Sequence, residues 1–223
     1  MKHLRVSSGA PADATATIAE AGVVAVLRAS VSRHMQAVAH DLVDAGIRVI
    51  EVTLTTPDAV TLLKQLHADL GGDALVGAGT VVSLDEAEAC IDAGADFLVS
   101  PATSLDVVAT ARIAGVAAYP GALTPTEILT AQRSGVSAVK LFPAASVGPG
   151  YLRQIRGPFP DIAIMPTGGI ALADVESWLR AGAMAVGLGT SLSGSACEDG
   201  PDAGLADRAR LALDGVASAR QDA

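Results

Sequence analysis

Short runs of β-branched and other apolar residues alternate along this chain with stretches of helical periodicity. That alternation is typical of βα units, in which a helix follows each strand and the strands lie parallel. Between the runs, segments such as HMQAVAHDLVDAG and SLDEAEACIDAG have apolar residues at helical spacing and end on a glycine, which a helix C-cap favours. The pattern predicts eight strands, at Val23–Arg28, Arg48–Leu54, Ala74–Thr80, Asp96–Pro101, Ala117–Ala122, Ala138–Ala144, Ile162–Gly169 and Met184–Thr190.

The predicted fold class is α/β. Eight βα units within about 200 residues favour a compact (β/α)8 TIM barrel over an open doubly wound sheet, which is the structural alternative. An Ala-Gly phrase recurs before the strands, as in DAGIRV, DAGADF, IAGVAA and RAGAMA, and marks the repeated helix-to-strand connection. We expect one barrel domain over residues 1–223, with residues 1–15 as a short N-terminal extension and a closing helix after Gly204.

The composition excludes several classes of function. A formal net charge of -9 and a pI near 4.7 argue against a nucleic-acid partner, because such binding depends on clustered Lys and Arg. No apolar run reaches the roughly 20 residues of a membrane helix, and the first residues, MKHLRVSSGA, lack the apolar core of a secretory signal. We therefore expect a soluble, cytoplasmic enzyme that acts on a small molecule.

The cysteines and histidines form no disulfide scaffold and no metal-binding motif. Cys90 and Cys197 are too few for a disulfide scaffold and too far apart for a C-x-x-C motif. Cys90 lies in a helical pattern and is expected in the core, whereas Cys197 lies in a polar segment, SGSACEDG, that is expected to be a loop. The four histidines form no H-x-x-x-H or H-E-x-x-H pair, so we predict no metal site and no cofactor.

Two charged residues interrupt predicted strands that are otherwise apolar. In a TIM barrel the active site lies at the C-terminal ends of the strands. Alternation along a strand would point one of its faces into the barrel, so Glu51 and Lys140 are candidates for that active site. One interpretation is structural, with a snorkelling Lys or an ion pair between the two. The other is chemical: a desolvated, partly neutral amine that attacks a ketone to form an imine, beside a carboxylate that moves protons.

Glycine-rich turns follow the last two predicted strands. The segments PTGGI and VGLGTSLSG come after strands seven and eight, where many TIM barrels bind phosphate. Glycines allow backbone N–H groups to approach an anion. The two turns together predict a phosphate site, although either alone is a weak signal. GAGTVVS is less specific, because its glycines could serve only tight packing in the barrel.

With these residues in view, the chain resembles the 2-keto-3-deoxy-6-phosphogluconate aldolase / 4-hydroxy-2-oxoglutarate aldolase family over nearly its whole length after residue 20. The matching phrases are VVAVLRA, GIRVIEVTLTT, VGAGTV, FLVSP, PGALTPTE, VKLFPA, GPFP, PTGGI and VGLGTSL, in that order. The resemblance implies a class I, metal-independent aldolase with a TIM barrel, commonly assembled as a homotrimer.

The resemblance also implies roles for individual residues. Lys140 would form the Schiff base and Glu51 would be the general acid/base. The remaining positions would bind the substrate: Thr80, Pro101 and Phe142 around the pyruvyl half, Thr167 at the carboxylate or nearby hydroxyls, Gly168, Gly169 and Ser191 at the phosphate, and Arg28 as an active-site cation.

One position departs from the family pattern. Some members have Arg in the phrase EVTLRT, where it contacts the substrate anion, and this chain has Thr55. Arg28 is a candidate for the missing charge. We expect reversible cleavage of 2-dehydro-3-deoxy-6-phosphogluconate to pyruvate and glyceraldehyde 3-phosphate, with 4-hydroxy-2-oxoglutarate or the phosphogalactonate epimer as alternative substrates. A non-catalytic phosphosugar-binding barrel, or a decarboxylase or epimerase, are the alternatives from other classes.

Overall fold

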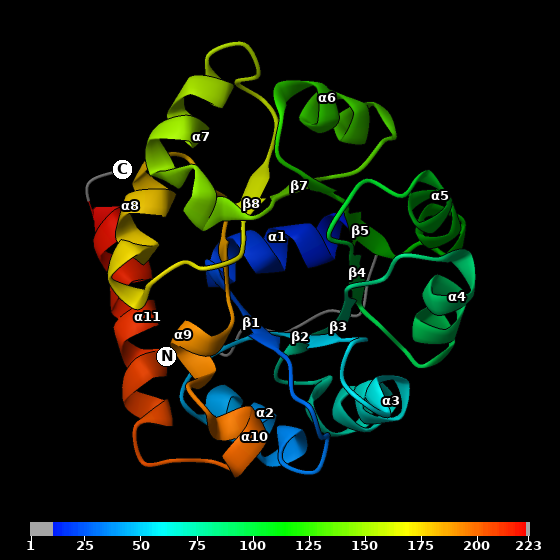
Figure 1. Ribbon diagram of the computed structural model, residues 1–223, viewed down its shortest axis with the longest axis vertical. Coiled ribbons are helices and arrows are strands. Elements are labelled where there is room, and N and C mark those ends of the chain that lie inside the picture. Colours follow the sequence, from blue (N-terminus) through cyan, green and yellow to red (C-terminus); the bar gives the residue numbers. More distant parts are fainter. Residues whose placement is uncertain (1–10, 222–223) are drawn as a thin grey trace.

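The barrel is formed by short parallel strands. A computed structural model describes residues 11–221 (Figure 1). The strands are β1 (Val23–Leu27), β2 (Val49–Thr53), β3 (Leu75–Gly79), β4 (Phe97–Val99), β5 (Ala117–Tyr119), β6 (Gly121–Ala122), β7 (Val139–Leu141), β8 (Ile164–Pro166) and β9 (Val186–Leu188). Each lies within one of the eight predicted ranges, with β5 and β6 sharing the fifth.

Hydrogen bonding curls these strands into a ring. One sheet has the order β5-β4-β3-β2-β1-β9 and the other β6-β7-β8, and the described pairings are parallel. Pro120 separates β5 from β6 along one continuous strand, because proline has no N–H to donate to the ladder. A parallel bridge between Thr167 and Gly187 joins β8 to β9. The predicted TIM barrel is confirmed.

Helices surround the ring (Figure 1). They are α2 (Met35–Asp44), α3 (Ala59–Leu70), α4 (Leu84–Asp92), α5 (Leu105–Ala114), α6 (Pro125–Arg133), α7 (Gly148–Arg156), α8 (Val175–Arg180), α9 (Thr190–Ser193), α10 (Ala196–Asp199) and α11 (Leu205–Gln221), with 3-10 turns at Ala144–Ser146 and Leu172–Asp174. α11 is the predicted closing helix. The Ala-Gly phrases end helices as predicted: Gly94 (φ 92°) and Gly115 (φ 72°) have left-handed backbone.

The apolar core has two parts. The larger lies between the outward faces of the strands and the helices, and includes Leu42, Leu66 and Trp178. The smaller fills the barrel itself, where Phe97 and Tyr119 pack with ring centroids 5.9 Å apart. Alternation along each strand therefore sends side chains into two separate cores, as buried parallel strands require.

A helix that the sequence analysis did not predict closes one end of the barrel. α1 (Pro11–Ala21) lies across the N-terminal ends of the strands, and Ile18 packs into the interior core (Figure 1). The N-terminal extension was expected to span residues 1–15, but this helix already begins at Pro11. Residues 1–10 lie outside the described residues. α1 is rich in Ala, and Ile18 is the one large buried side chain among residues 14–21, so the apolar periodicity is weak.

Both cysteines are buried. Cys90 has no exposed surface, as predicted, and burial raises the pKa of its thiol to about 11. The prediction for Cys197 was wrong: it lies on α10 with 2% of its surface exposed, and burial raises its pKa. The segment is polar by composition, but Ala196 and Cys197 face the core. Within residues 11–221, no helix has the length and apolarity needed to cross a membrane.

Candidate active site

Lys140 and Glu51 meet inside the barrel near its C-terminal end. Lys140 lies on β7 and Glu51 on β2, and the Lys140 Nζ to Glu51 Oε1 distance is 3.9 Å. The exposed fractions are 5% for Lys140 and 1% for Glu51, so both charges are withdrawn from water. Neither carboxylate oxygen of Glu51 has a hydrogen-bond partner among the described residues. A buried, unbonded carboxylate is costly, and it leaves acceptors free for a substrate or a water.

Packing holds the Glu51 carboxylate in place. It lies over Gly79 of β3, and a β-carbon on that glycine would overlap the carboxylate. Across the barrel, the Phe142 ring lies beside Lys140, with Nζ 5.2 Å from the ring centroid. The aromatic face stabilises a cation at that distance and excludes water from one side of the amine. The lysine and the carboxylate are therefore confined by groups of fixed position.

Thr167 presents an unused hydroxyl. It follows β8 with 5% of its surface exposed, and its Oγ1 has no hydrogen-bond partner among the described residues. Gly187 lies against this hydroxyl, where a β-carbon would collide with it. Native structures rarely leave a buried hydroxyl unpaired, so the group is available to bind a ligand.

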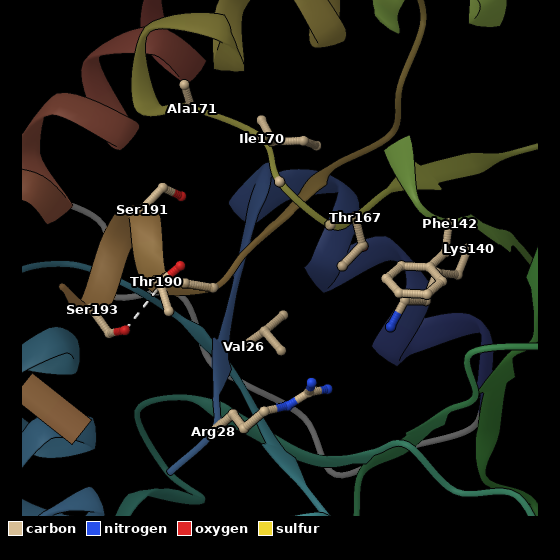
Figure 2. A pocket seen from close by; sticks show the side chains of 13 residues that line it. Val26, Arg28, Lys140, Phe142, Thr167, Ile170, Ala171, Thr190, Ser191 and Ser193 are labelled. Carbon is tan, nitrogen blue, oxygen red and sulfur yellow. Dashed lines mark hydrogen bonds between the residues drawn. The ribbon is translucent and has the colours of Figure 1, made fainter. Parts of the chain in front are cut away.

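A cavity of about 530 Å³ opens over these groups at the C-terminal ends of β1, β7, β8 and β9 (Figure 2). That volume is within the range of small-molecule sites. The cavity contains both predicted glycine turns, and Gly168 (φ 97°) has left-handed backbone and packs against the Phe142 ring. Its lining residues are Val26, Arg28, Lys140, Phe142, Thr167, Gly168, Gly169, Ile170, Ala171, Gly189, Thr190, Ser191 and Ser193.

Arg28 brings a second positive charge to this cavity. Its side chain extends from the end of β1 toward Lys140, away from Ser191 (Figure 2). Its Nη2 donates to Thr80 Oγ1 at 3.4 Å, which is long for a hydrogen bond. Thr80 has φ 63°, a left-handed conformation that is uncommon for a β-branched residue and is often found at functional sites. The two cations favour an anionic ligand.

Three predicted site residues lie outside the cavity lining. Glu51 lies beneath Lys140, Thr80 contacts Arg28, and Pro101 lies in the loop after β4 with its carbonyl close to Gly121. Thr55, the position that departs from the family pattern, is exposed, and its Oγ1 is 3.2 Å from Thr53 Oγ1. The other predicted residues line one cavity together.

Several lining residues were missed by the sequence analysis. Val26 lines the wall between Arg28 and Thr167, and Ile170 and Ala171 extend the turn after Gly169 (Figure 2). Alternation offered a signal for Val26, because it lies two residues before Arg28 and so faces the same way. No comparable signal marks Ile170 and Ala171, which line the cavity because of the path of their loop.

Comparison with known proteins agrees with this geometry. Residues 14–203 match the family model described as "Aldolase: KDPG and KHG aldolase". The chain belongs to the KDPG and KHG aldolase family. The matched region runs from α1 to the loop between α10 and α11 and includes every residue of the site described above.

Two relatives within the family show the range of names. The chain is 36% identical over 199 residues to a 2-dehydro-3-deoxy-phosphogluconate aldolase from Pseudoalteromonas atlantica, covering 88% of this chain and 91% of that protein. It is 31% identical over 171 residues to a 2-dehydro-3-deoxy-6-phosphogalactonate aldolase from Escherichia coli, covering 76% and 83%. Relatives named for either epimer are thus similar to this chain.

One of the similar solved structures contains a covalent reaction intermediate. KDPG aldolase from Legionella pneumophila, with pyruvate captured as a covalent carbinolamine intermediate, matches with a TM-score of 0.75 and 27% identity, covering 96% of this chain and 98% of that one. A carbinolamine is the adduct that precedes an imine. Membership of this family makes the chain an enzyme, a class I aldolase of the Schiff-base type.

Proposed function

We propose that the enzyme reversibly cleaves 2-dehydro-3-deoxy-6-phosphogluconate to pyruvate and glyceraldehyde 3-phosphate, with Lys140 as the Schiff-base residue. One observation carries the proposal. A single cavity has the buried Lys140 amine, with Glu51 beneath it, at its inner end and two glycine turns with Ser191 at the other. A nucleophile, a proton carrier and an anion site are thus arranged along one substrate-sized space.

The chemistry follows from these groups. The neutral Lys140 amine adds to the C2 carbonyl, and loss of water from the carbinolamine forms the imine. The imine accepts the electron pair of the C3–C4 bond as the C4 hydroxyl loses its proton, which leaves an enamine and the aldehyde. Protonation of the enamine carbon and hydrolysis release pyruvate and restore the amine. Glu51 moves these protons, because neither of its carboxylate oxygens has a hydrogen-bond partner among the described residues and Oε1 lies 3.9 Å from Nζ.

Arg28 and Thr80 hold the pyruvyl carboxylate in this proposal. Arg28 extends toward Lys140, its contact with Thr80 is long, and Thr55 offers no charge at the position where some relatives have arginine. The free hydroxyl of Thr167 donates to the same carboxylate or to a neighbouring substrate hydroxyl. Phe142 lines this half of the pocket, whereas Pro101 lies outside the lining.

The opposite end of the cavity holds the phosphate. Gly168 and Gly169 have positive φ and Gly169 is exposed, so their backbone is accessible to an anion, and Ser191 adds a hydroxyl (Figure 2). The phosphogalactonate epimer is the second candidate substrate, because the 31% identical relative carries that name. The unphosphorylated 4-hydroxy-2-oxoglutarate is less favoured, since it makes no use of a phosphate site.

Reductive trapping tests the imine. Borohydride with pyruvate should inactivate the enzyme, because hydride reduces the imine and leaves a 1-carboxyethyl group whose mass is found on the peptide that contains Lys140. Borohydride alone is the control and should leave activity intact. An active enzyme that forms no adduct, or an adduct on Lys64 instead, would falsify the assignment.

Substrate choice is tested by kcat/KM on the three candidate substrates. Ser191→Asp places a negative charge at the proposed phosphate site and should reduce kcat/KM for the two phosphorylated substrates only. Ser195→Asp is the matched control, because Ser195 is exposed and lies outside the cavity. Equal losses with 4-hydroxy-2-oxoglutarate would contradict a phosphate site at Ser191.

We also propose that the enzyme is a homotrimer, and light scattering would test this oligomeric state.

A further inference from the structure

The backbone that follows β1 is held in an unusual way. The two residues after Arg28 form backbone hydrogen bonds to side chains from other parts of the chain. The partners are Thr56 Oγ1 for the Ala29 N–H at 3.2 Å and Glu198 Oε1 for the Ser30 N–H at 2.7 Å. This short segment therefore depends on its neighbours, one of which, Glu198, belongs to α10.

Glu198 makes the strongest of these contacts. One carboxylate oxygen accepts the Ser30 N–H at 2.7 Å and the other accepts the Ser30 hydroxyl at 2.6 Å. These hydrogen bonds hold the pKa of Glu198 below its ordinary value, so the carboxylate is the charged acceptor at neutral pH. Nothing in the proposed chemistry uses Glu198, which lies outside the cavity.

The Arg28 guanidinium has little to orient it apart from its backbone. Its one described hydrogen bond, to Thr80, is 3.4 Å long. We propose that Glu198 is a positioning residue that fixes the segment after β1 against α10, so that Arg28 is directed toward the pyruvyl carboxylate. This inference rests on the proposed function, because it assumes that Arg28 binds that carboxylate.

The phosphate end is held by a different residue. Arg208 of α11 donates to the carbonyl oxygens of Leu192 at 2.7 Å and Ser193 at 2.9 Å, and pairs with Asp202 at 2.8 Å. These contacts anchor α9, which bears Ser191, without involving Glu198. Loss of the Glu198 contact should therefore weaken binding at one end of the substrate and spare the other.

The test uses pyruvate and inorganic phosphate as separate probes of the two ends. In Glu198→Gln, the pyruvate concentration that half-saturates borohydride inactivation should rise about fivefold while the maximal rate stays unchanged, because binding and not imine chemistry is impaired. The inhibition constant of inorganic phosphate should not change. Glu176→Gln is the matched control, since Glu176 is an exposed carboxylate paired with Arg180 and should alter neither value.

Ser30 variants keep the test decisive if Glu198→Gln folds poorly. Ser30→Ala removes one of the two hydrogen bonds and should raise the half-saturating pyruvate concentration about twofold, whereas Ser30→Thr keeps the hydroxyl and should match wild type. Glu198→Gln with Ser30→Ala should be no worse than Glu198→Gln alone, because both act through one contact. Additive losses would overturn the proposal, as would a parallel rise in the phosphate constant.

Arg28→Ala separates this inference from the proposed function. If wild type forms no pyruvyl adduct, the proposed function fails. If it does, and Arg28→Ala weakens pyruvate binding but Glu198→Gln does not, the positioning role fails alone. If neither variant weakens pyruvate binding, the positioning role also fails, while the imine at Lys140 stands.

Discussion

The two ends of the barrel interior differ although the same strands form both. At the N-terminal end, α1 contributes Ile18 to a layer of buried side chains that also contains Phe97 and Tyr119. At the C-terminal end, Lys140 and Glu51 occupy the interior beneath an open cavity. One end is packed like an ordinary core, and the other contains buried charge and unpaired polar atoms.

On two of the strands, the apolar residue of the closed end and the charged residue of the open end are consecutive inward-facing positions. On β2 the inward position changes from Val49 to Glu51, and on the strand that includes β7 it changes from Ala138 to Lys140. Each pair is two residues apart, so both members face the barrel axis. A TIM barrel can thus keep its stability in one layer and vary its chemistry in the next.

Lys140→Met should have the largest effect on this difference between the two ends, because it replaces the charged inward-facing side chain of β7 with an apolar one. Turnover should fall by about 10⁴-fold or more, since no amine remains to form the imine. Steady-state assay and borohydride trapping with pyruvate would measure it. Turnover within tenfold of wild type would exclude Lys140 as the imine-forming residue.

Glu51→Gln keeps the size of the side chain over Gly79 and removes its charge. Turnover should fall about 10³-fold because proton transfer is lost, while slow trapping of pyruvate on Lys140 should continue. Asp96→Asn is the matched control: this partly buried carboxylate accepts the Val76 N–H at 2.8 Å near the closed end. The comparison fails if the Asp96 variant loses as much turnover as the Glu51 variant.

Ile18→Ala should affect only the closed end. The loss of a fully buried side chain that packs inside the barrel should lower the free energy of unfolding by about 3 kcal/mol. The kcat/KM of the folded enzyme at 25 °C should stay the same. Urea unfolding with a parallel activity assay measures both quantities. Leu211→Ala, at a position with 52% of its surface exposed, is the control and should change stability little.

Tyr119→Phe tests the closed end with the smallest expected effect at neutral pH, about 1 kcal/mol of stability, through loss of the hydrogen bond to Thr15 (2.9 Å). Burial raises the pKa of Tyr119 from 10.0 to about 12, and the Thr15 hydrogen bond opposes part of that rise. The neutral phenol therefore contributes stability that is complete below pH 10 and is lost as the pH rises toward 12.

Urea unfolding at pH 8 and pH 11 would measure this effect, with the phenylalanine variant as the reference. Wild type should lose more stability than Tyr119→Phe between those two values, because the other titrating groups are common to both proteins. Equal losses would mean that Tyr119 is not protected from ionisation in the folded state.

Much of the fold could be predicted from the sequence, because each βα unit is encoded locally. The eight strands lie where β-branched runs lie, and the glycines of the Ala-Gly phrases, such as Gly94 and Gly115, have the expected left-handed backbone, although Gly71 after α3 does not. α1 could not be predicted in the same way, since its role depends on a barrel formed by residues far along the chain. The burial of Cys197 likewise depends on how α10 packs and not on its polar neighbours.

The candidate site could be predicted from the sequence where a charged residue interrupts an apolar strand. Lys140 and Glu51 stand out as charges in apolar strands, and the structure brings them within 3.9 Å of each other. Distances of this kind depend on strand register, which residue type alone does not reveal. The contact between Glu198 and Ser30 had no sequence signal either, because an exposed Glu and an exposed Ser far apart in the chain are common.

The closure of the barrel by α1 has a kinetic consequence. Because the interior below Lys140 is filled, reactants enter and leave by the same opening, and the buried lysine lies deeper than exposed Gly169 and Thr190. In the proposed mechanism, the fragment bound to Lys140 is then the last to depart, and the aldehyde has to leave first. We expect a fixed order of release, in which pyruvate binds the free enzyme and competes with the substrate.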